Sequence, residues 1–553
     1  MTPRPIFSFV FLCLVFFGHN AWSQARDTTK KVEILPGARK LELLKINDST
    51  QLQILVGNVK LKQGNTLFYC DSCVINNSSH IFEAFGHVHI NDGDTANAYS
   101  DYLRYLTDKR IAYMQKNVRL TDGKATLTTN NLEYDTDTKI GIYTNGGTVV
   151  NKKSVLTSME GYYYTDLKDI YFKKNVELKD PAYYLKADSL LYNTESEVAR
   201  FIAKTFIRDS ANRTIVTREG YYDTRNRKAE FGSRPIIEDG ARRYTGDKIS
   251  TNDSTHMSQI IGNAVIIDTA QGTTIIGGVI IANNSTESFL AFNKPLMIVK
   301  QEKDSIYITA DTLFSARLSD LYGVKDSTIK DSAQKDSMTM VKKADTKQTL
   351  KKTDTKQKDS TDRYFEAFYH VRIFSDSVQS VCDSMFYSFK DSVFRLFKDP
   401  VVWSKENQVT GDTILLFTKN KKADRIKVFE NSLLVSKVQA DFFNQVKSAR
   451  MDGYLTDGSL DSVRARGFAE CIYYIQNEDS SFTGINQSTS DIIDIYFGQD
   501  STGKERELQK VVFRSAVKGT LWPMHAKTPE ELRLRNFKWF ADRRPKTKYD
   551  LYE

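Results

Sequence analysis

Apolar and polar residues alternate in short runs along this 553-residue chain, and the runs return about every 30 residues. The first is Gly57-Asn58-Val59-Lys60-Leu61, and similar runs begin at Gly86, Lys116 and Lys174. Alternation of this kind is typical of a β-strand with one buried face. A repeat of this length indicates stacked units that bury a shared core. The pattern therefore predicts an all-β protein.

A second motif follows each run and centres on Asp, Asn or Gly. Its apolar positions change phase: Leu185 and Ala187 precede Asp188, whereas Leu190 and Tyr192 follow it. One extra residue would cause this shift, as in a β-bulge or a corner, and Asp, Asn and Gly tolerate such backbone. We therefore assign the repeated acid a structural role. The motif is centred on Asp71, Asp101, Asn131, Gly161, Asp188, Gly220, Asp247, Gly278 and Asp311.

Composition divides the chain into six segments. An apolar run with a small-residue cleavage site predicts a signal peptide over 1–23, and a lead-in follows over 24–35. Repeats are predicted over 36–324 and again over 363–500, separated by a disordered loop of Lys, Asp, Ser, Thr and Gln over 325–362. In the tail, 501–553, Thr528-Pro529-Glu530-Glu531 predicts the start of a short helix carrying Leu532 and Trp539 on one side.

Charge and hydropathy set few limits. The formal net charge is +9 and the mean hydropathy is −0.45. After the leader no run approaches the roughly 18 apolar residues of a membrane-spanning helix. The mature chain is therefore expected to be exported and water-exposed. The modest positive charge fits attraction to phosphate-bearing lipid or glycan, and it fits ordinary solubility equally well.

Candidate chemistry is sparse. The chain lacks the common hydrolase, metalloprotease and nucleotide-binding motifs, so we predict no enzyme activity, catalytic residue, metal or cofactor. Cys70 and Cys73 are expected on opposite faces of a strand as structural thiols. His87 and His89 are expected to face solvent on one strand face, without a third metal ligand.

The two motifs together resemble the repeat of the OstA-like family, which includes the LptA-like periplasmic bridge proteins of lipopolysaccharide transport. The resemblance stands on residues 57–61, 174–178, 185–192 and 308–314. It covers residues 40–320 well and 363–450 less closely. Each motif is weak alone, and their number and spacing make the resemblance specific.

The resemblance implies an elongated, twisted β-jellyroll of stacked OstA-like repeats, open along one side, that shelters lipid A acyl chains in an apolar groove during transport to the outer membrane. The residues implied as groove lining are the inward members of the runs, for which plain core packing is the alternative. They are Val59, Leu61, Val88, Ile90, Val118, Leu120, Val176 and Leu178.

The implied partners are lipopolysaccharide through its lipid A, and other jellyroll proteins of the bridge, joined by edge-strand addition. Head-to-tail self-association is a further option, and no nucleic-acid partner is expected. The implied location is the periplasm, with attachment to the outer membrane through partners. A surface or secreted β-solenoid that binds glycan or acts as a scaffold remains the alternative.

Overall fold

The computed structural model describes residues 31–93, 96–300, 304–323, 361–420, 422–477, 481–499 and 506–552. The predicted leader lies outside these residues, as does the charged loop except for its last two positions. Strands dominate the described residues, which confirms the all-β prediction. Within these ranges the structure contains no helix that is both long enough and apolar enough to cross a membrane.

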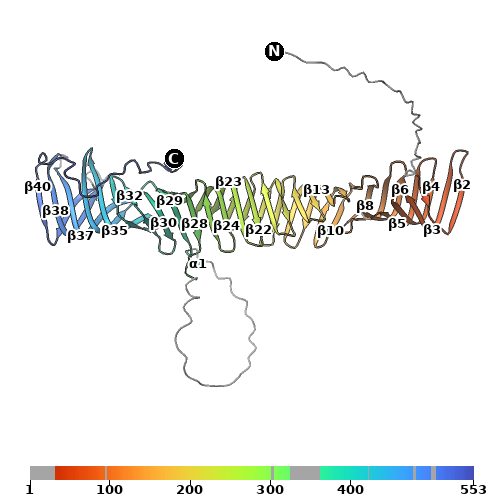
Figure 1. Cartoon of the computed structure of the whole chain (residues 1–553), viewed down its shortest axis with the longest axis horizontal. Coiled ribbons are helices and arrows are strands. Elements are labelled where there is room, and N and C mark those ends of the chain that lie inside the picture. Colours follow the sequence, from red (N-terminus) through yellow and green to blue (C-terminus); the bar gives the residue numbers. More distant parts are fainter. Residues whose placement is uncertain are drawn as a thin grey trace, which may run out of the picture. The chain divides into compact units, whose positions relative to one another are not determined.

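The described chain forms two compact units. The first comprises residues up to Lys152 together with Met159–Asp169. Its strands pair antiparallel, each with the next along the chain from β3 to β9, and Figure 1 shows them side by side in red to orange. They are β1 (Glu33–Ile34), β2 (Lys40–Lys45), β3 (Gln51–Gln63), β4 (Thr66–Asn76), β5 (Ile81–Asp92), β6 (Ala96–Leu106), β7 (Ile111–Thr121), β8 (Ala125–Asp135), β9 (Ile140–Tyr143), β10 (Gly147–Asn151) and β12 (Glu160–Tyr164).

The second unit comprises Lys153–Ser158 and the chain from Ile170 onward. Its strands continue to Trp522, beyond residue 500 where the sequence placed the start of the tail. This unit also contains two short helices, α1 (Leu318–Gly323) and the 3₁₀ helix η2 (Lys548–Tyr552). The strands are β11 (Ser154–Ser158), β13 (Asp169–Lys179), β14 (Tyr183–Asn193), β15 (Val198–Phe201), β16 (Thr205–Asp209), β17 (Thr214–Thr217), β18 (Glu219–Asp223), β19 (Lys228–Gly232), β20 (Ile236–Asp239), β21 (Arg242–Thr245), β22 (Lys248–Asn252), β23 (Met257–Asp268), β24 (Thr273–Asn283), β25 (Ser288–Phe292), β26 (Leu296–Val299), β27 (Ile306–Thr309), β28 (Thr312–Ala316), β29 (Tyr364–Phe374), β30 (Gln379–Ser388), β31 (Val393–Phe397), β32 (Val401–Ser404), β33 (Asn407–Thr410), β34 (Thr413–Lys419), β35 (Lys422–Gln439), β36 (Phe442–Thr456), β37 (Ser459–Gln476), β38 (Phe482–Gln499), β39 (Arg506–Arg514) and β40 (Lys518–Trp522).

A crease runs across the strands of each unit. At the crease two consecutive residues have positive φ and stand opposite a single residue of the next strand, as Gly86 (φ 72°) and His87 (φ 42°) do between the register pairs Phe85↔Tyr102 and Val88↔Ser100. This is a β-bulge, and it bends the strand. Each long strand therefore contributes one half to each of two facing sheets. Such pairs recur at 57/58, 86/87, 116/117, 174/175, 233/234, 262/263, 293/294, 369/370, 398/399, 430/431, 467/468 and 515/516.

The repeated Asp residues fasten the crease. Asn117 donates a hydrogen bond from Nδ2 to Asp101 Oδ2 over 2.7 Å, and His87 Nδ1 lies 2.7 Å from Asp71 Oδ2. The predicted phase change is confirmed. Buried residues alternate with others up to Cys70, two outward residues follow, and Cys73 is buried again. The expectation that the Asp itself adopts the unusual backbone was wrong. The left-handed residues belong to the Gly-Asn run of the following strand, where Gly and Asn tolerate positive φ best.

The free rims of the two sheets meet opposite the crease, along what we call the seam. In the first unit the turns after β3, β5 and β7 lie at one rim, and those after β4, β6 and β8 lie at the other. Gln63 donates from Nε2 to the Thr107 carbonyl of the opposite rim over 3.0 Å. Tyr134 donates its hydroxyl to Asp92 Oδ2 over 2.7 Å in the same way. Polar contacts therefore close the side that the resemblance implied to be open.

The residues after β40 form an extended strap, 523–552, on the second unit. Figure 1 shows it in dark blue running back from β40 toward β29. Gln445, 2% exposed, donates to the Leu532 carbonyl and accepts from the Leu534 amide. Gln408, fully buried, makes the same two bonds with Lys538 and Phe540. Each glutamine thus clamps the strap backbone as a neighbouring strand would.

The helix expected to begin at Thr528 does not form. Its cap is present, since the Thr528 amide donates to Glu531 Oε2 over 2.8 Å and the Glu531 amide bonds Thr528 Oγ1. The backbone then continues as turns, because Gln445 and Gln408 take the peptide groups that a helix would pair internally. The short C-terminal helix is η2, twenty residues further on, where Asp550 bonds the Lys546 amide.

Candidate functional site

The residues predicted to line an interior lie between the two sheets. All eight are 0–1% exposed. In the first unit three of them share one row of direct cross-strand partners. It runs Leu61, Phe68, Ile90, Ala98, Leu120, Leu127 across six consecutive strands, and every member is at most 2% exposed. Val176 and Leu178 lie in the second unit, where Leu178 pairs with Leu156.

Three aromatic rings meet inside the first unit. Phe68 lies in one sheet, and Phe82 and Tyr105 lie in the other. The ring centres of Phe68 and Tyr105 are 4.7 Å apart, and those of Phe68 and Phe82 are 5.2 Å apart. The sheets are therefore in contact here, and a chain-like ligand would have to displace these rings. Phe68 and Phe82 were not predicted as inward residues because they lie outside the Gly-Asn runs from which that prediction was made.

The seam of the first unit is charged but sheltered from water. The Asp92 side chain is 1% exposed and pairs with Lys139 Nζ from the opposite rim. It also accepts a hydrogen bond from Thr66 Oγ1 over 2.8 Å. Burial, and then the Asp92 charge, raise the pKa of Tyr134 far above its ordinary range, so this phenol remains a donor. Burial raises the pKa of Tyr105 to about 12.

Ion pairs bridge the seam of the second unit as well. Arg213 Nη2 lies 3.4 Å from Asp253 Oδ1, and Arg242 Nη2 lies 3.5 Å from Glu287 Oε2. Attraction between these charges strengthens where water is excluded. Opening the seam would expose each charge to water, which replaces the lost partner. A seam built of polar contacts can therefore open and close again without leaving a buried charge unpaired.

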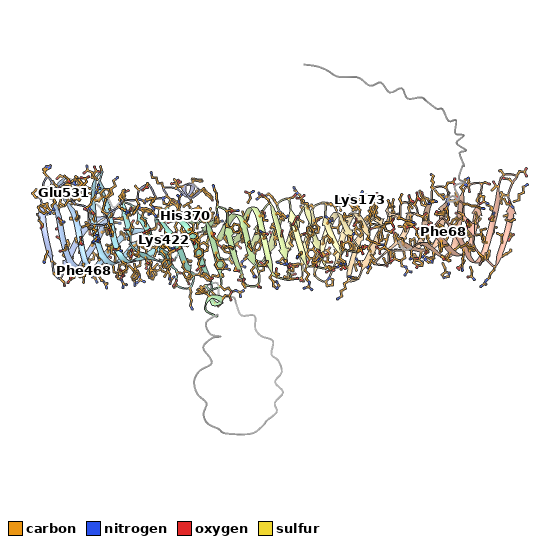
Figure 2. All side chains as sticks on the ribbon, in the orientation of Figure 1. Phe68, Lys173, His370, Lys422, Phe468 and Glu531 are labelled. Atoms are coloured by element: carbon orange, nitrogen blue, oxygen red, sulfur yellow. The ribbon has the colours of Figure 1, made fainter. Side chains whose placement is uncertain are left out.

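The interior of the second unit is not uniformly filled. Cavities of about 50 and 30 Å³ lie behind the Arg242 and Arg213 pairs. A cavity of about 210 Å³ lies further along the chain, between apolar side chains and a polar edge at the seam. The edge includes Lys422, which Figure 2 labels. The apolar lining is Ile306, Ile373, Val378, Phe394 and Leu416.

The thiols and imidazoles serve packing. Cys70 and Cys73 are free thiols that both face inward, contrary to the expected opposite faces, because the chain changes phase between them. A hydrogen bond with Cys70 and then burial raise the pKa of Cys73. His89 stacks between Tyr69 and Tyr99, whereas His87 sits exposed at the crease, so the two imidazoles do not share a site. Among the described residues no cluster of three or more His, Cys, Asp or Glu could hold a metal ion.

These features define the class: each unit is a creased β-jellyroll with an apolar interior and a polar seam. Residues 30–188 match the model of the OstA-like protein family. The match confirms the resemblance that the repeated motifs indicated. Comparison with curated protein sequences gives no match.

Solved structures resemble part of the chain. Among them is the crystal structure of LptH, the LptA-homologous periplasmic component of the lipopolysaccharide transport device of Pseudomonas aeruginosa. The two share 12% sequence identity, and the likeness covers 19% of this chain and 79% of that one, with a TM-score of 0.18.

Proposed function

We propose that this protein is a periplasmic component of lipopolysaccharide transport that holds the acyl chains of lipid A between its two sheets. The proposal rests first on the OstA-like match over residues 30–188. Lipid A would enter through the seam and displace the inward contacts of the Leu61–Leu127 row. Val59, Val88 and Val118 would line its path in the first unit, and Val176 and Leu178 would line the corresponding path in the second.

One observation carries the proposal: the interior is apolar, whereas the seam that closes it is polar. An apolar row crosses six strands without a polar side chain, so it offers an acyl chain an unbroken surface. Its cover is a set of hydrogen bonds and ion pairs that water can replace. A protein with a purely structural core would gain by sealing this side with apolar side chains.

The edge strand β2 supports the proposed partners. β2 pairs with β3, and the described residues give it no second strand partner. All six of its residues are exposed, and Leu41 and Leu43 are 54% and 58% exposed. An unpaired apolar edge favours addition of a strand from another jellyroll. The same edge would support head-to-tail self-association.

Photocrosslinking tests the proposed interior. A photoreactive amino acid replaces Val118, which is fully buried, or its exposed neighbour Arg119 as the matched control. After incubation with lipopolysaccharide and illumination, we expect lipid adducts at position 118 and none at position 119. Mass spectrometry of the purified chain identifies them.

Equal labelling at both positions would contradict a lipid path between the sheets. Absence of adducts at both, in chain whose strand content matches the unsubstituted protein, would favour the alternative of a scaffold or glycan-binding β-solenoid. The close packing of Phe68, Phe82 and Tyr105 is the observation that favours that alternative.

A further inference from the structure

The crease of β37, in the second unit, lacks the Asn or His that many of the described creases carry. The second left-handed residue of a crease is commonly Asn or His, whose side chain bonds the Asp of the preceding strand, as Asn431 bonds Asp412 over 3.1 Å. In β37 this position is Phe468, with φ 47°, and the crease residue of the preceding strand near it is Ala449. An aromatic residue is poorly suited to left-handed backbone, and it gains nothing here from packing.

Phe468 points into solvent. It is 91% exposed, and Figure 2 labels it at the lower margin of the second unit, on the side away from Glu531 of the strap. A residue that is unfavourable for its backbone and also leaves an aromatic ring in water marks a functional site more often than a structural one. The ring is therefore available to a partner outside the chain.

A basic depression lies on the sheet face beside this crease. It has a volume of about 400 Å³ and is lined by five cationic and two acidic side chains, an excess of three positive charges. The cations come from neighbouring strands, and Arg466 lies two residues before Phe468. The charged lining residues are Arg425, Lys427, Arg450, Arg464, Arg466, Asp452 and Asp494.

The arrangement of these cations is unfavourable on its own. Arg450 and Arg466 are direct cross-strand partners, and like charges directly opposite each other destabilise a sheet. They share one weak counter-ion, since each guanidinium lies 3.7 Å from Asp452. An anion placed between them would relieve the repulsion. Planar guanidinium groups suit phosphate in particular, because they donate two parallel hydrogen bonds.

Two buried acids hold the guanidinium groups in place. The Asp494 side chain is 3% exposed and accepts bonds from Arg464 Nε at 2.5 Å and Arg514 Nε at 2.9 Å. The hydrogen bond from Arg464 holds the pKa of Asp494 below its ordinary value. At the crease itself Asp491 and Glu430 are exposed and would face the same partner. They reduce the positive charge there without reversing it.

We propose that Phe468 and the Arg450–Arg466 depression dock the second unit on a membrane surface that carries anionic phospholipid headgroups. The guanidinium groups bind lipid phosphates, and the Phe468 ring enters the headgroup layer, where aromatic side chains are favoured. This contact is separate from the interior row and needs no lipid between the sheets. It gives the protein a second lipid interaction on its outer face.

Vesicle cosedimentation of the full chain tests this docking. The vesicles contain phosphatidylethanolamine with phosphatidylglycerol, and vesicles of phosphatidylcholine serve as the neutral surface. Two variants are compared with the unsubstituted chain. Phe468→Asn restores the residue that other creases carry, so the strand should fold at least as well. Arg450→Gln with Arg466→Gln removes two facing like charges and keeps amide donors beside Asp452, and its strand content is checked by circular dichroism before binding is compared.

We expect binding to the anionic vesicles that weakens with added salt and falls about tenfold or more in each variant. Lys60→Gln with Lys62→Gln removes the same charge from exposed positions of the first unit and should leave binding unchanged. Equal binding by all variants, or no preference for anionic vesicles, would overturn the proposal. Complete release by inorganic phosphate, at an ionic strength at which sodium chloride leaves the chain bound, would also overturn it, because the site would then take small anions rather than a lipid surface.

Discussion

At the scale of single residues, the crease explains why the repeat is conserved along the chain in form but not in sequence. Each crease needs two left-handed residues, and a crease that is held by a side-chain bond also needs an acceptor on the preceding strand. Gly-Asn, Gly-His, Lys-Asn and Glu-Asn all meet the first requirement, and Asp71, Asp101, Asp247 and Asp412 meet the second. Asn and His succeed because their polar side chains can bond locally while the backbone is left-handed.

Two glycine substitutions, one in a turn and one in a crease, separate the cost of left-handed backbone from the cost of crowding. Gly86 has φ 72°, and a Cβ there would lie 2.4 Å from Asp71 Oδ2. Gly64 has φ 60°, and a Cβ there would meet nothing within 4 Å. We expect Gly64→Ala to lower the free energy of unfolding by roughly 1 kcal/mol, the cost of left-handed backbone. Gly86→Ala should cost about 1 kcal/mol or more beyond that, because Asp71 must move away and weaken its bond to His87.

Denaturant unfolding, followed by circular dichroism, measures the difference between the two alanine variants. The comparison is internal to the first unit, so both variants share one unfolding transition. Equal losses would mean that crowding by Asp71 contributes nothing to the requirement for glycine in this crease.

At the scale of elements, the strap turns one outer face of a sheet into a third buried layer. Direct cross-strand partners form the row Gln379, Trp403, Gln408, Val435, Gln445, Ile472, in which glutamine and apolar residues alternate. The apolar members pack against Leu532, Leu534 and Phe540 of the strap. The glutamines bond its backbone, or in the case of Gln379 the side chain of Arg544.

Removing one glutamine should loosen the strap. Gln408→Ala leaves the Lys538 carbonyl and the Phe540 amide without their partner, and also the Trp403 indole. Unsatisfied buried groups cost about 1–3 kcal/mol each. We expect faster amide hydrogen exchange across residues 528–542, measured by mass spectrometry. Gln63→Ala removes a comparably buried glutamine of the first unit and should leave strap exchange unchanged. Slow exchange in Gln408→Ala would show that apolar packing alone holds the strap.

At the scale of the whole molecule, β2 is where chain-to-chain addition should start. Leu41→Lys with Leu43→Lys places charges along its exposed edge, and charged edges resist pairing. We expect concentration-dependent self-association, measured by sedimentation velocity, to be lost in this variant. Leu167→Lys introduces charge at a leucine that is 66% exposed but lies in a turn, and it should retain self-association. Association that survives in both variants would place the contact elsewhere.

The sequence allowed prediction of whatever depends on local alternation. The strands, the phase change at Asp71 and the burial of Val59, Ile90 and Leu120 follow from neighbours a few residues apart. The seam depends on partners such as Gln63 and Thr107, which no local pattern connects. The strap was predicted as a helix because Thr528 and Glu531 form a correct cap. Gln445 and Gln408 lie about a hundred residues earlier, and their side chains bond the peptide groups that a helix would otherwise pair internally.

The strap follows in sequence every strand that it covers. As the chain emerges from its N-terminus to its C-terminus, the row from Gln379 to Ile472 is therefore complete before its cover arrives. In that interval Trp403, Val435 and Ile472 face water, and transiently exposed apolar surface of this kind promotes aggregation. Docking of the strap closes this interval. We therefore expect slow docking of the strap to lower the yield of soluble chain.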